Sequence, residues 1–300
     1  MAPNHETVNR AQPQLQLTPE LTRLLRAALK EDLGPGDVTS ERTVAPRVRG
    51  RGELIAKQAG VLCGAPVAAA VWRLADRGVK IQWHCRDGER VRAGDRVATL
   101  EGRMRGLLVG ERLALNFLQR LSGIATLTCR FHDAAGGANG PLICDTRKTT
   151  PLWRALERYA VRVGGGMNHR FGLFDMVLIK ENHARAAGGL REAIRAVKAP
   201  GAQDGRKRLK VMAEARDAEE VAICCAEGVD LILLDNFTPA RARAVIARFR
   251  SCGIPFEISG GVTLKNVAAY ARAGADRISI GALTHSAPAL DLSLQLYPVE

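Results

Sequence analysis

Hydrophobic and polar positions follow a regular pattern after residue 140. Apolar runs of strand length alternate with segments of helical pattern, and the strand runs cover residues 141–145, 175–180, 208–214, 231–235, 255–259 and 277–281. Runs that are apolar throughout are typical of parallel strands that are covered on both faces. The last four runs end 21, 24 and 22 residues apart, which is the length of one strand-helix unit. Six such units favour a parallel βα barrel over a doubly wound sheet, although the pattern does not define the strand order.

The pattern before residue 140 is different. Residues 19–33 are predicted to form a helix, capped by Thr18 and ended by Gly34, and residues 34–43 are rich in turn formers. Short strands alternate with turns over residues 50–101. An amphipathic helix is predicted over residues 111–128, with a break at Gly123. A further helix, over residues 151–164, is predicted to be capped by Thr150, opened by Pro151 and ended by Gly164.

Composition narrows the class of protein. The 300 residues carry a net charge of +13, which attracts anions. Basic residues form no continuous block and aromatic residues make up only 4%, so a nucleic-acid partner is disfavoured. The seven cysteines form no C-x-x-C pair and fit a reducing cytoplasm, while Cys224 and Cys225 have no predicted role. We find neither a signal peptide nor an apolar run long enough to cross a membrane.

Charged, polar or glycine residues end each apolar run: Asp145 with Arg147 and Lys148; Lys180; Glu214; Asp235; Ser259 with Gly260 and Gly261; and Gly281. In parallel βα barrels the carboxyl ends of the strands meet at one mouth, where the chemistry takes place. These residues are therefore candidate site residues. The alternative is that they only meet solvent or form ion pairs that stabilise the barrel.

The candidate residues separate by charge. The cations are Arg147, Lys148, Lys180, His169 and Arg170, and they suit a substrate with several carboxylates or phosphates. The carboxylates of Glu214 and Asp235 suit Mg²⁺ held mainly through water or substrate oxygens.

Two glycine turns add a third feature. Gly260 and Gly261 are predicted to lie just before a helix, and Gly281 precedes a short segment with His285. Such turns expose backbone N–H groups to phosphate, and the loops after the last two strands are the usual phosphate site of a barrel. No Walker or G-x-G-x-x-G motif is present. The residues alone therefore predict a βα barrel that binds a phosphorylated, metal-chelated substrate and a small acidic partner.

Several longer motifs resemble the quinolinate phosphoribosyltransferases, also called nicotinate-nucleotide pyrophosphorylases (carboxylating). They are EDLGPGDVTS, ERLALNFLQRLSGIAT, LILLDNF, EISGGV, GADRISIGALTHS and, over residues 145–183, a segment with DTRKT, NHR and LIKENH. The resemblance runs from about residue 20 to the C-terminus. It implies a glycosyltransferase of NAD biosynthesis that converts quinolinate and 5-phosphoribosyl-1-diphosphate to nicotinate mononucleotide, diphosphate and CO2 with Mg²⁺.

The resemblance also implies an architecture. We expect an α/β protein with an N-terminal α/β sandwich over residues 19–116 plus 286–300 and an incomplete parallel βα (TIM-like) barrel over residues 117–285. The preceding residues 1–18 are polar and contain proline, and this composition by itself predicts a flexible tail. It further implies a cytoplasmic homodimer with shared active sites, or a higher homo-oligomer, without nucleic-acid or membrane partners.

Site residues are carried over motif by motif. The resemblance implies that the quinolinate carboxylates are surrounded by Arg147, His169, Arg170 and Lys180. Lys148 would lie between the two substrates, and Arg112 would reach into the partner's site. Glu214 and Asp235 would face the ribose and the Mg²⁺–diphosphate. The 5-phosphate would be lined by Ser259, Gly260, Gly261, Gly281 and His285.

One position departs from the family pattern. Met212 stands where a first glutamate is usual, two residues before Glu214 and on the same strand face. The coordination of Mg²⁺ would then depend more on oxygen atoms of the substrate and of water. A related phosphoribosyltransferase for nicotinate is the alternative within this fold, and the dense cationic cluster favours a dicarboxylate. A nucleic-acid-binding protein is the alternative in another class, and it requires an outer stripe of basic residues.

Overall fold

A computed structural model describes residues 13–199 and 208–299. The chain divides into two compact units. Unit 1 comprises Met1–Leu127, Pro151–Gly164 and Ala287–Glu300, and unit 2 comprises Thr128–Thr150 and Gly165–Ser286. The first twelve residues of the tail predicted over residues 1–18 lie outside the described residues. The predicted domain boundaries stay a prediction.

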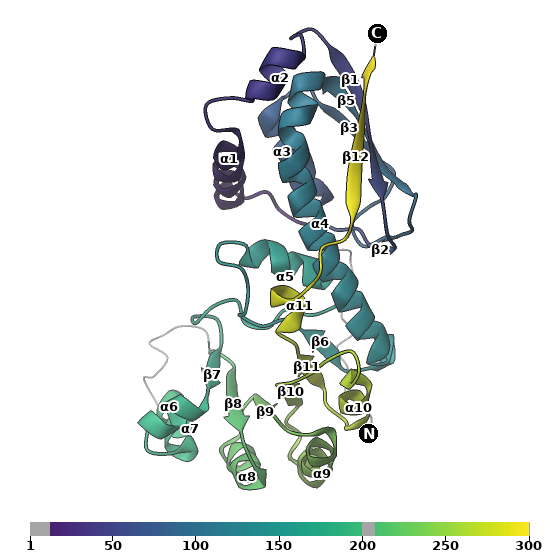
Figure 1. Cartoon of the computed structure of the whole chain (residues 1–300). Helices are drawn as coiled ribbons and strands as arrows, with labels where there is room; N and C mark the ends of the chain where they lie inside the picture. The colour runs from purple at the N-terminus through teal and green to yellow at the C-terminus, as the bar shows by residue number, and fades with distance from the viewer. Residues whose placement is uncertain (1–12, 200–207, 300) are drawn as a thin grey trace. The chain divides into compact units, whose positions relative to one another are not determined.

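Unit 1 contains a four-stranded antiparallel sheet in the order β12-β1-β5-β3 (Figure 1). Its strands are β1 (Arg49–Ala56), β3 (Lys80–Trp83), β5 (Arg96–Arg103) and β12 (Leu292–Val299), and a two-stranded sheet pairs β2 (Gly60–Val61) with β4 (Arg90–Val91). Buried and more exposed positions alternate along β1, so one face of the sheet packs on the core. The C-terminal strand pairs with β1 over its whole length, from Arg49 with Val299 to Ala56 with Leu292.

The helices of unit 1 agree in part with the predictions. They are α1 (Pro19–Leu33), α2 (Val38–Thr43), α3 (Ala65–Ala75), α4 (Met104–Ala134, in this unit up to Leu127) and α5 (Arg154–Val163). The prediction for α1 is confirmed, because Thr18 Oγ1 accepts the N–H of Leu21 at 3.2 Å and Gly34 is the C-cap. The turn-rich prediction for residues 34–43 is confirmed at Gly34 and Pro35 and was wrong for Val38–Thr43, because Asp37 caps a short helix there by accepting the N–H groups of Thr39 and Ser40. Helix α3 had not been predicted.

The predicted break at Gly123 was also wrong, since α4 runs without interruption through this residue. A Cβ atom at Gly123 would lie 2.0 Å from the carbonyl oxygen of Pro288. The glycine therefore serves close approach of a backbone and not a bend in the helix.

Helix α5 begins later than predicted. Residues 151–153 form a turn, with Leu152 at a φ of 66°, and the cap position is Trp153, which makes no side-chain capping bond. Thr150 and Pro151 therefore do not start the helix. The predicted end at Gly164 is confirmed.

Unit 2 is built on a parallel sheet of six strands in the order β6-β11-β10-β9-β8-β7 (Figure 1). The strands are β6 (Leu142–Cys144), β7 (Val177–Ile179), β8 (Val211–Ala215), β9 (Leu231–Asp235), β10 (Phe256–Ser259) and β11 (Arg277–Ser279). All six predicted strands are present. Neighbours in the sheet are neighbours in sequence, except that the first strand pairs with the last. No reversal of direction divides the sheet, as it would in a doubly wound fold. The incomplete barrel predicted from the sequence stays a prediction.

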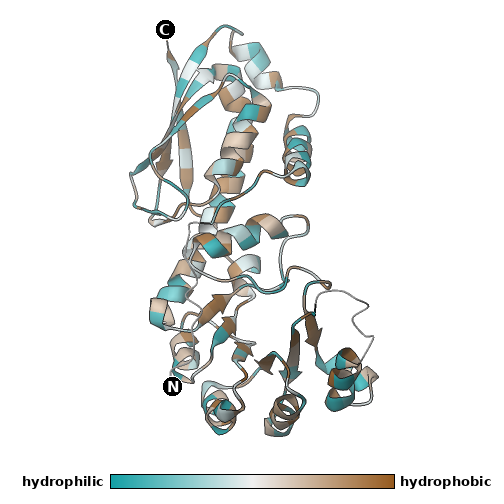
Figure 2. Cartoon of the chain, turned by 180° about the vertical axis from the view of Figure 1, so that it is seen from behind, coloured by the Kyte–Doolittle hydropathy of each residue, from teal (hydrophilic) through white to brown (hydrophobic). Residues whose placement is uncertain are grey.

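Helices follow the strands in sequence: α6 (Glu181–Ala186), α7 (Leu190–Lys198), α8 (Ala218–Glu227), α9 (Pro239–Phe249), α10 (Val267–Arg272) and α11 (Ala282–His285). Figure 1 shows α7 to α10 along one face of the sheet, and Figure 2 shows the strands as its hydrophobic layer. On the strands Leu178, Met212, Leu231 and Leu233 form a buried cluster. Among the described residues, no helix is both long and apolar enough to cross a bilayer.

Candidate active site

The carboxyl ends of the strands of unit 2 are level with one another. Asp235 pairs in register with Ser259, Ser259 with Ser279, and Ser279 with Cys144. The residues that end these strands therefore share one edge of the sheet, as the sequence predicted. Of the predicted site residues only Arg112 belongs to unit 1, where it is exposed on α4.

Two arginines at this edge, Arg147 and Arg170, are near enough for their charges to interact. Arg170 is partly buried and donates from its guanidinium to the carbonyl oxygen of Met176 at 3.0 Å. Burial and the nearby charge of Arg147 both lower the pKa of Arg170. Arg147 is exposed, and within the described part of the chain no hydrogen bond or ion pair engages its side chain. Two close guanidinium groups favour an anion that bridges or screens them.

Asp145 fixes the segment that carries His169 and Arg170. This aspartate is fully buried at the end of β6, and it accepts hydrogen bonds from the backbone N–H of His169 at 2.7 Å and the side-chain amide of Asn168 at 2.6 Å. The N–H of Met167 in turn donates to the carbonyl of Ile143 at 2.7 Å. The end of β6 therefore holds residues 167–170 through both backbone and side-chain bonds.

The two predicted carboxylates lie at the ends of neighbouring strands. Glu214 Oε2 lies 3.6 Å from Lys180 Nζ, and the side chain of Glu214 is only 9% exposed. Burial raises the pKa of Glu214, Lys180 opposes this rise, and the charge of Asp235 adds to it. The last effect shows that the carboxylates are close enough to influence each other.

These two carboxylates could contribute to a metal site, but they would not complete one. In the described ranges no group of three or more His, Cys, Asp or Glu residues could hold a metal ion. A pair of carboxylates fits Mg²⁺, which takes few protein oxygens and completes its shell with water and phosphate. Met212 points the same way along the strand as Glu214 and is fully buried in the cluster with Leu178, Leu231 and Leu233.

The glycine turns differ from one another. Gly260 and Gly261 have left-handed φ values of 94° and 62°, but α10 begins only at Val267. The prediction that this pair lies directly before a helix was therefore wrong. A Cβ atom at Gly260 would lie 2.1 Å from the side-chain oxygen of Asn236, so the glycine makes room for that side chain.

Lys148, Gly281 and His285 come together at the end of β11. A Cβ atom at Gly281 would lie 3.0 Å from Lys148 Cδ and 3.1 Å from His285 Nε2. The hydroxyl of Thr284 donates to the carbonyl oxygen of Lys148 at 2.8 Å and so joins α11 to the loop after β6. The structure therefore places a lysine and a histidine beside a glycine, and a cationic side chain in this arrangement could contact a phosphate group.

Three polar residues of this edge had not been predicted. Asn236, at a φ of 58°, donates from its side chain to Asp235 Oδ2 at 2.7 Å. Glu257 and Ser279 are buried on β10 and β11, and the hydroxyl of Ser279 donates to Glu257 Oε1. Glu257 interrupts an otherwise apolar run, and this charge within a strand was the signal that could have identified it.

Comparison with known proteins identifies the family. Residues 37–122 match the N-terminal domain and residues 124–295 the C-terminal domain of quinolinate phosphoribosyl transferase. The chain is 39% identical over 279 residues to the probable nicotinate-nucleotide pyrophosphorylase [carboxylating] of Bacillus subtilis, with 92% of this chain and 93% of that protein covered. It is 40% identical over 277 residues to the Mycobacterium leprae nicotinate-nucleotide pyrophosphorylase [carboxylating], with 91% and 95% covered.

A solved structure supports the same assignment. The chain is similar to NadC from Streptococcus pyogenes with a TM-score of 0.88 and 37% identity, over 96% of this chain and 100% of that one. Sequence matches and fold similarity both extend over nearly the whole chain. The chain belongs to the quinolinate phosphoribosyltransferase family.

Proposed function

We propose that this chain transfers the phosphoribosyl group of 5-phosphoribosyl-1-diphosphate to quinolinate and removes one carboxylate, giving nicotinate mononucleotide, diphosphate and CO2. Family membership supplies the reaction of NAD biosynthesis. The observation that carries the site assignment is that the charge of Arg147 acts on Arg170 and, with burial, lowers its pKa, because a substrate with two carboxylates would relieve the repulsion between these guanidinium groups.

The quinolinate end of the proposed site lies at the ends of β6 and β7. Arg147, Arg170 and Lys180 would bind the two carboxylates, and His169 would lie behind them. Lys180 is 53% exposed, so its ammonium group is accessible to a substrate while it lies near Glu214. A dicarboxylate can form ion pairs with more of these three cations than a monocarboxylate can.

The phosphoribosyl end would lie toward β10 and β11. We assign the 5-phosphate to the turns with Ser259, Gly260, Gly261, Gly281 and His285. Lys148 passes over Gly281 and would stand between the two substrates. Its charge would stabilise the negative charge that develops on the leaving diphosphate.

The carboxylates of Glu214 and Asp235 would stabilise the ribose. When the bond between the anomeric carbon and diphosphate breaks, the ribose ring becomes positively charged, and two nearby carboxylates oppose that charge. They are also the residues that would hold Mg²⁺, through water or substrate oxygens. When bound, Mg²⁺ neutralises charge on the diphosphate.

The substrate itself makes the decarboxylation possible. Ribosylation leaves the ring nitrogen cationic, so the electron pair of the broken bond to CO2 is stabilised at the adjacent carbon, which then takes up a proton. The protein's part is to keep the carboxylate and the ring in place, which the fixed segment 167–170 supports.

We further propose a cytoplasmic homodimer, or a higher oligomer of such dimers, in which Arg112 completes the partner's site. The exposure of Arg112 on α4 supports this role. All seven cysteines are free, which fits a reducing compartment.

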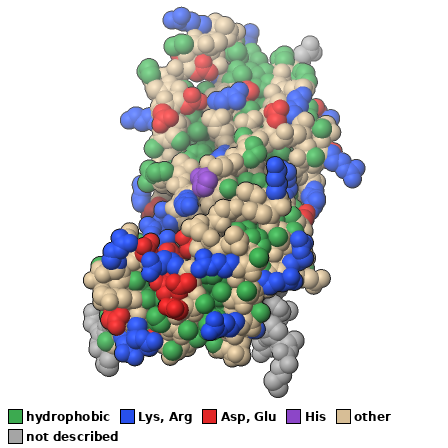
Figure 3. All heavy atoms as spheres, turned by 60° about the horizontal axis from the view of Figure 1, so that its bottom comes forward, with side chains coloured by type: hydrophobic (Ala, Val, Ile, Leu, Met, Phe, Trp, Pro, Cys, Tyr) green, Lys and Arg blue, Asp and Glu red, His purple; other side chains and the backbone are tan. Residues whose placement is uncertain are grey.

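The direct test is an assay of purified protein with quinolinate, 5-phosphoribosyl-1-diphosphate and Mg²⁺. We expect equal amounts of CO2 and nicotinate mononucleotide. Turnover with nicotinate in the absence of turnover with quinolinate would instead establish the related monocarboxylate enzyme. A nucleic-acid-binding function is disfavoured on the face drawn in Figure 3, where Lys and Arg side chains are dispersed and Asp and Glu side chains lie among them.

A further inference from the structure

Glu257 is a fully buried carboxylate below the candidate active site. Its Oε1 accepts a hydrogen bond from the hydroxyl of Ser279 and lies 3.4 Å from Nε2 of His169. Its Oε2 is buried and has no hydrogen-bond partner among the described residues. Burial of a carboxylate with one oxygen unsatisfied is unfavourable, so an apolar residue would serve the stability of the strand better. A carboxylate at this position therefore calls for a functional explanation.

The hydrogen bonds of His169 define where its ring proton lies. Its Nδ1 accepts the backbone N–H of Arg170 at 2.7 Å, so this nitrogen carries no proton. The proton is then on Nε2, the nitrogen that faces Glu257. Both ring nitrogens are thus directed at protein groups, and the imidazole is aligned from both sides.

His169 links Glu257 to the cation next in sequence. The backbone N–H of His169 is held by Asp145 at 2.7 Å, and its ring holds the backbone N–H of Arg170. The position of Arg170 therefore depends on the orientation of the His169 ring, and that orientation depends on Glu257.

We propose that Glu257 is a positioning residue for the dicarboxylate substrate: it holds His169 in the tautomer with the proton on Nε2 and thereby fixes Arg170 against a substrate carboxylate. This inference rests on the proposed function, because it takes Arg170 as a ligand of quinolinate. Glu257 itself does not touch the substrate in this proposal.

Two variants of Glu257 test separately the loss of its hydrogen-bond acceptor and the loss of its negative charge. Glu257→Met keeps an unbranched side chain of similar length and removes the acceptor, whereas Glu257→Gln keeps an oxygen that can accept from His169 and Ser279. Because binding through Arg170 acts in both ground and transition states, we expect Glu257→Met to raise the KM for quinolinate about tenfold or more with a smaller change in kcat. The KM for 5-phosphoribosyl-1-diphosphate should change less than about twofold, and Glu257→Gln should stay within about threefold of the unchanged protein.

The tautomer gives a readout that a purely structural role would not change. The ¹⁵N chemical shifts of the His169 ring, assigned by their loss in His169→Asn, should show a protonated Nε2 and an unprotonated Nδ1. The same signals should be retained in Glu257→Gln and should show mixed tautomers in Glu257→Met.

Two controls keep the outcomes distinct. Asp276 accepts the N–H of Phe256, the residue before Glu257, at 2.8 Å and pairs with Arg250, and no hydrogen bond or ion pair found among the described residues joins it to His169. Asp276→Asn should therefore lower stability without raising the KM for quinolinate. Arg170→Lys tests the proposed function: an unchanged KM for quinolinate would remove Arg170 from the site. A raised KM in Arg170→Lys together with an unchanged KM in Glu257→Met, or an unchanged His169 tautomer there, would overturn the role of Glu257 alone.

Discussion

The carboxyl group of Glu214 is harder to ionise than a glutamate in water, because burial and the charge of Asp235 outweigh the attraction of Lys180. The proposed role in the transition state requires the ionised form. Its raised pKa places the loss of that form at a higher pH than for a free glutamate, whose pKa is about 4.3. We expect kcat/KM for 5-phosphoribosyl-1-diphosphate to fall as the pH drops through this raised value.

Two variants should shift the acidic limb of this pH profile, the range in which kcat/KM falls at low pH, in opposite directions. Asp235→Asn removes a charge that raises the pKa of Glu214, so the limb should shift to lower pH even though the rate falls. Lys180→Met removes a charge that lowers this pKa, so the limb should shift to higher pH. Rate measurements across the pH range check both shifts, and a limb that stays in place in both variants would exclude Glu214 as the titrating group.

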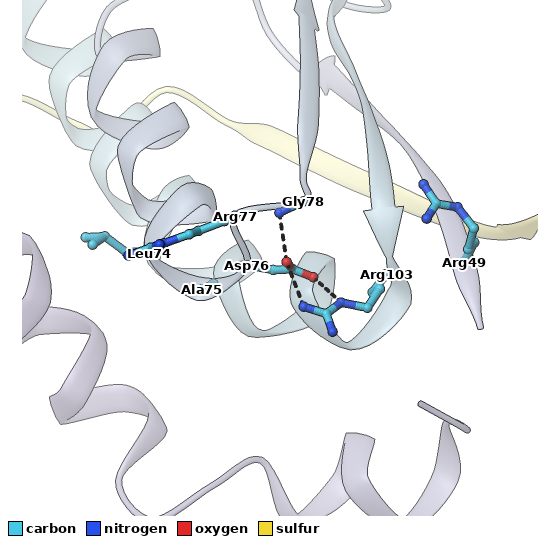
Figure 4. Close-up of a pocket in the computed structure, with 7 residues that line it drawn as sticks. All are labelled: Arg49, Leu74, Ala75, Asp76, Arg77, Gly78 and Arg103. Atoms are coloured by element: carbon cyan, nitrogen blue, oxygen red, sulfur yellow. Dashed lines mark hydrogen bonds and ion pairs between the residues drawn. The ribbon is translucent and has the colours of Figure 1, made fainter. Parts of the chain in front are cut away.

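A second carboxylate has the opposite shift. In unit 1, Asp76 accepts two hydrogen bonds from Arg103, at 2.8 and 3.0 Å, and one from the N–H of Gly78 at 2.9 Å (Figure 4). The bonds from Arg103 lower the pKa of Asp76, although burial opposes them. The stabilisation of the folded protein by ionised Asp76 is therefore present above the pKa of about 3.9 that an aspartate has in the unfolded chain. It is lost as the pH falls through the lower pKa of Asp76 in the folded protein.

Asp76→Asn should accordingly lower the free energy of unfolding at neutral pH by about 1–2 kcal/mol, a figure reduced by the exposure of Arg103. The difference from the unchanged protein should shrink below about pH 4. Urea unfolding at both pH values measures it. Arg23→Gln is the control, because the ion pair of Arg23 with Glu20 is exposed on both sides and its loss should change the free energy of unfolding much less than Asp76→Asn does at neutral pH.

Charges at strand ends could be recognised from the sequence because a break in an apolar run is a local signal. Lys180, Glu214 and Asp235 were found in this way. Asn236 was not, because its importance depends on a left-handed backbone. The charge of Glu257 within an apolar run was a local signal, but its contacts with Ser279 and His169 depend on the pairing of β10 with β11 and could not be predicted. Neither the left-handed backbone nor the strand pairing is encoded in a short stretch of sequence.

At the level of elements, capping signals were reliable only where the cap is local. Thr18 and Gly34 delimit α1 as predicted, since the bonds involved lie within four residues. Thr150 and Pro151 carry the same signals, but residues 151–153 form a turn, so the capping pattern was not sufficient there. The prediction of a helix break at Gly123 of α4 was wrong for a related reason. The role of this glycine depends on its contact with Pro288, which lies far away in sequence.

Gly123→Ala tests that explanation. Helix propensity alone predicts a gain of about 1 kcal/mol from this change. We expect a loss of about 2 kcal/mol or more instead, because the new methyl group would meet the backbone carbonyl of Pro288. That segment cannot move freely, since the N–H of Leu290 donates to the carbonyl of Gln119 at 2.9 Å and the Gln119 side chain donates to the carbonyl of Leu292 at 2.8 Å.

Thermal and urea unfolding of Gly123→Ala measure the effect. Asn116→Ala, at an exposed position of the same helix, is the matched control and should be neutral or slightly stabilising. A Gly123→Ala protein as stable as this control would show that Gly123 is not required for the close approach.

For the whole molecule, the parallel sheet of unit 2 could be predicted because its strands are mainly apolar and alternate with helices along the chain. The antiparallel sheet of unit 1 was less clear. Its edge strand β12 comes from the C-terminus and pairs with β1, some 240 residues away, and only the family resemblance assigned the C-terminal residues to the first domain. Long-range pairing of this kind leaves no periodic signal in either segment.

The assembly of the molecule leads to the last prediction. If Arg112 of one subunit completes the site of its partner, Arg112→Ala and Lys148→Ala proteins should each be inactive alone. When they are mixed, half of the dimers formed by random exchange should be hybrids. In each hybrid one of the two sites combines an intact Arg112 with an intact Lys148. We therefore expect roughly a quarter of the activity of the unchanged protein.

Two tags, one on each variant, would confirm that subunits have exchanged, and each variant incubated with itself is the control. Activity should appear at the rate at which the hybrid dimers form, because neither homodimer contains an intact site. Confirmed hybrids without any recovered activity would show that Arg112 acts within its own subunit or outside the site, and the shared arrangement would then have to be abandoned.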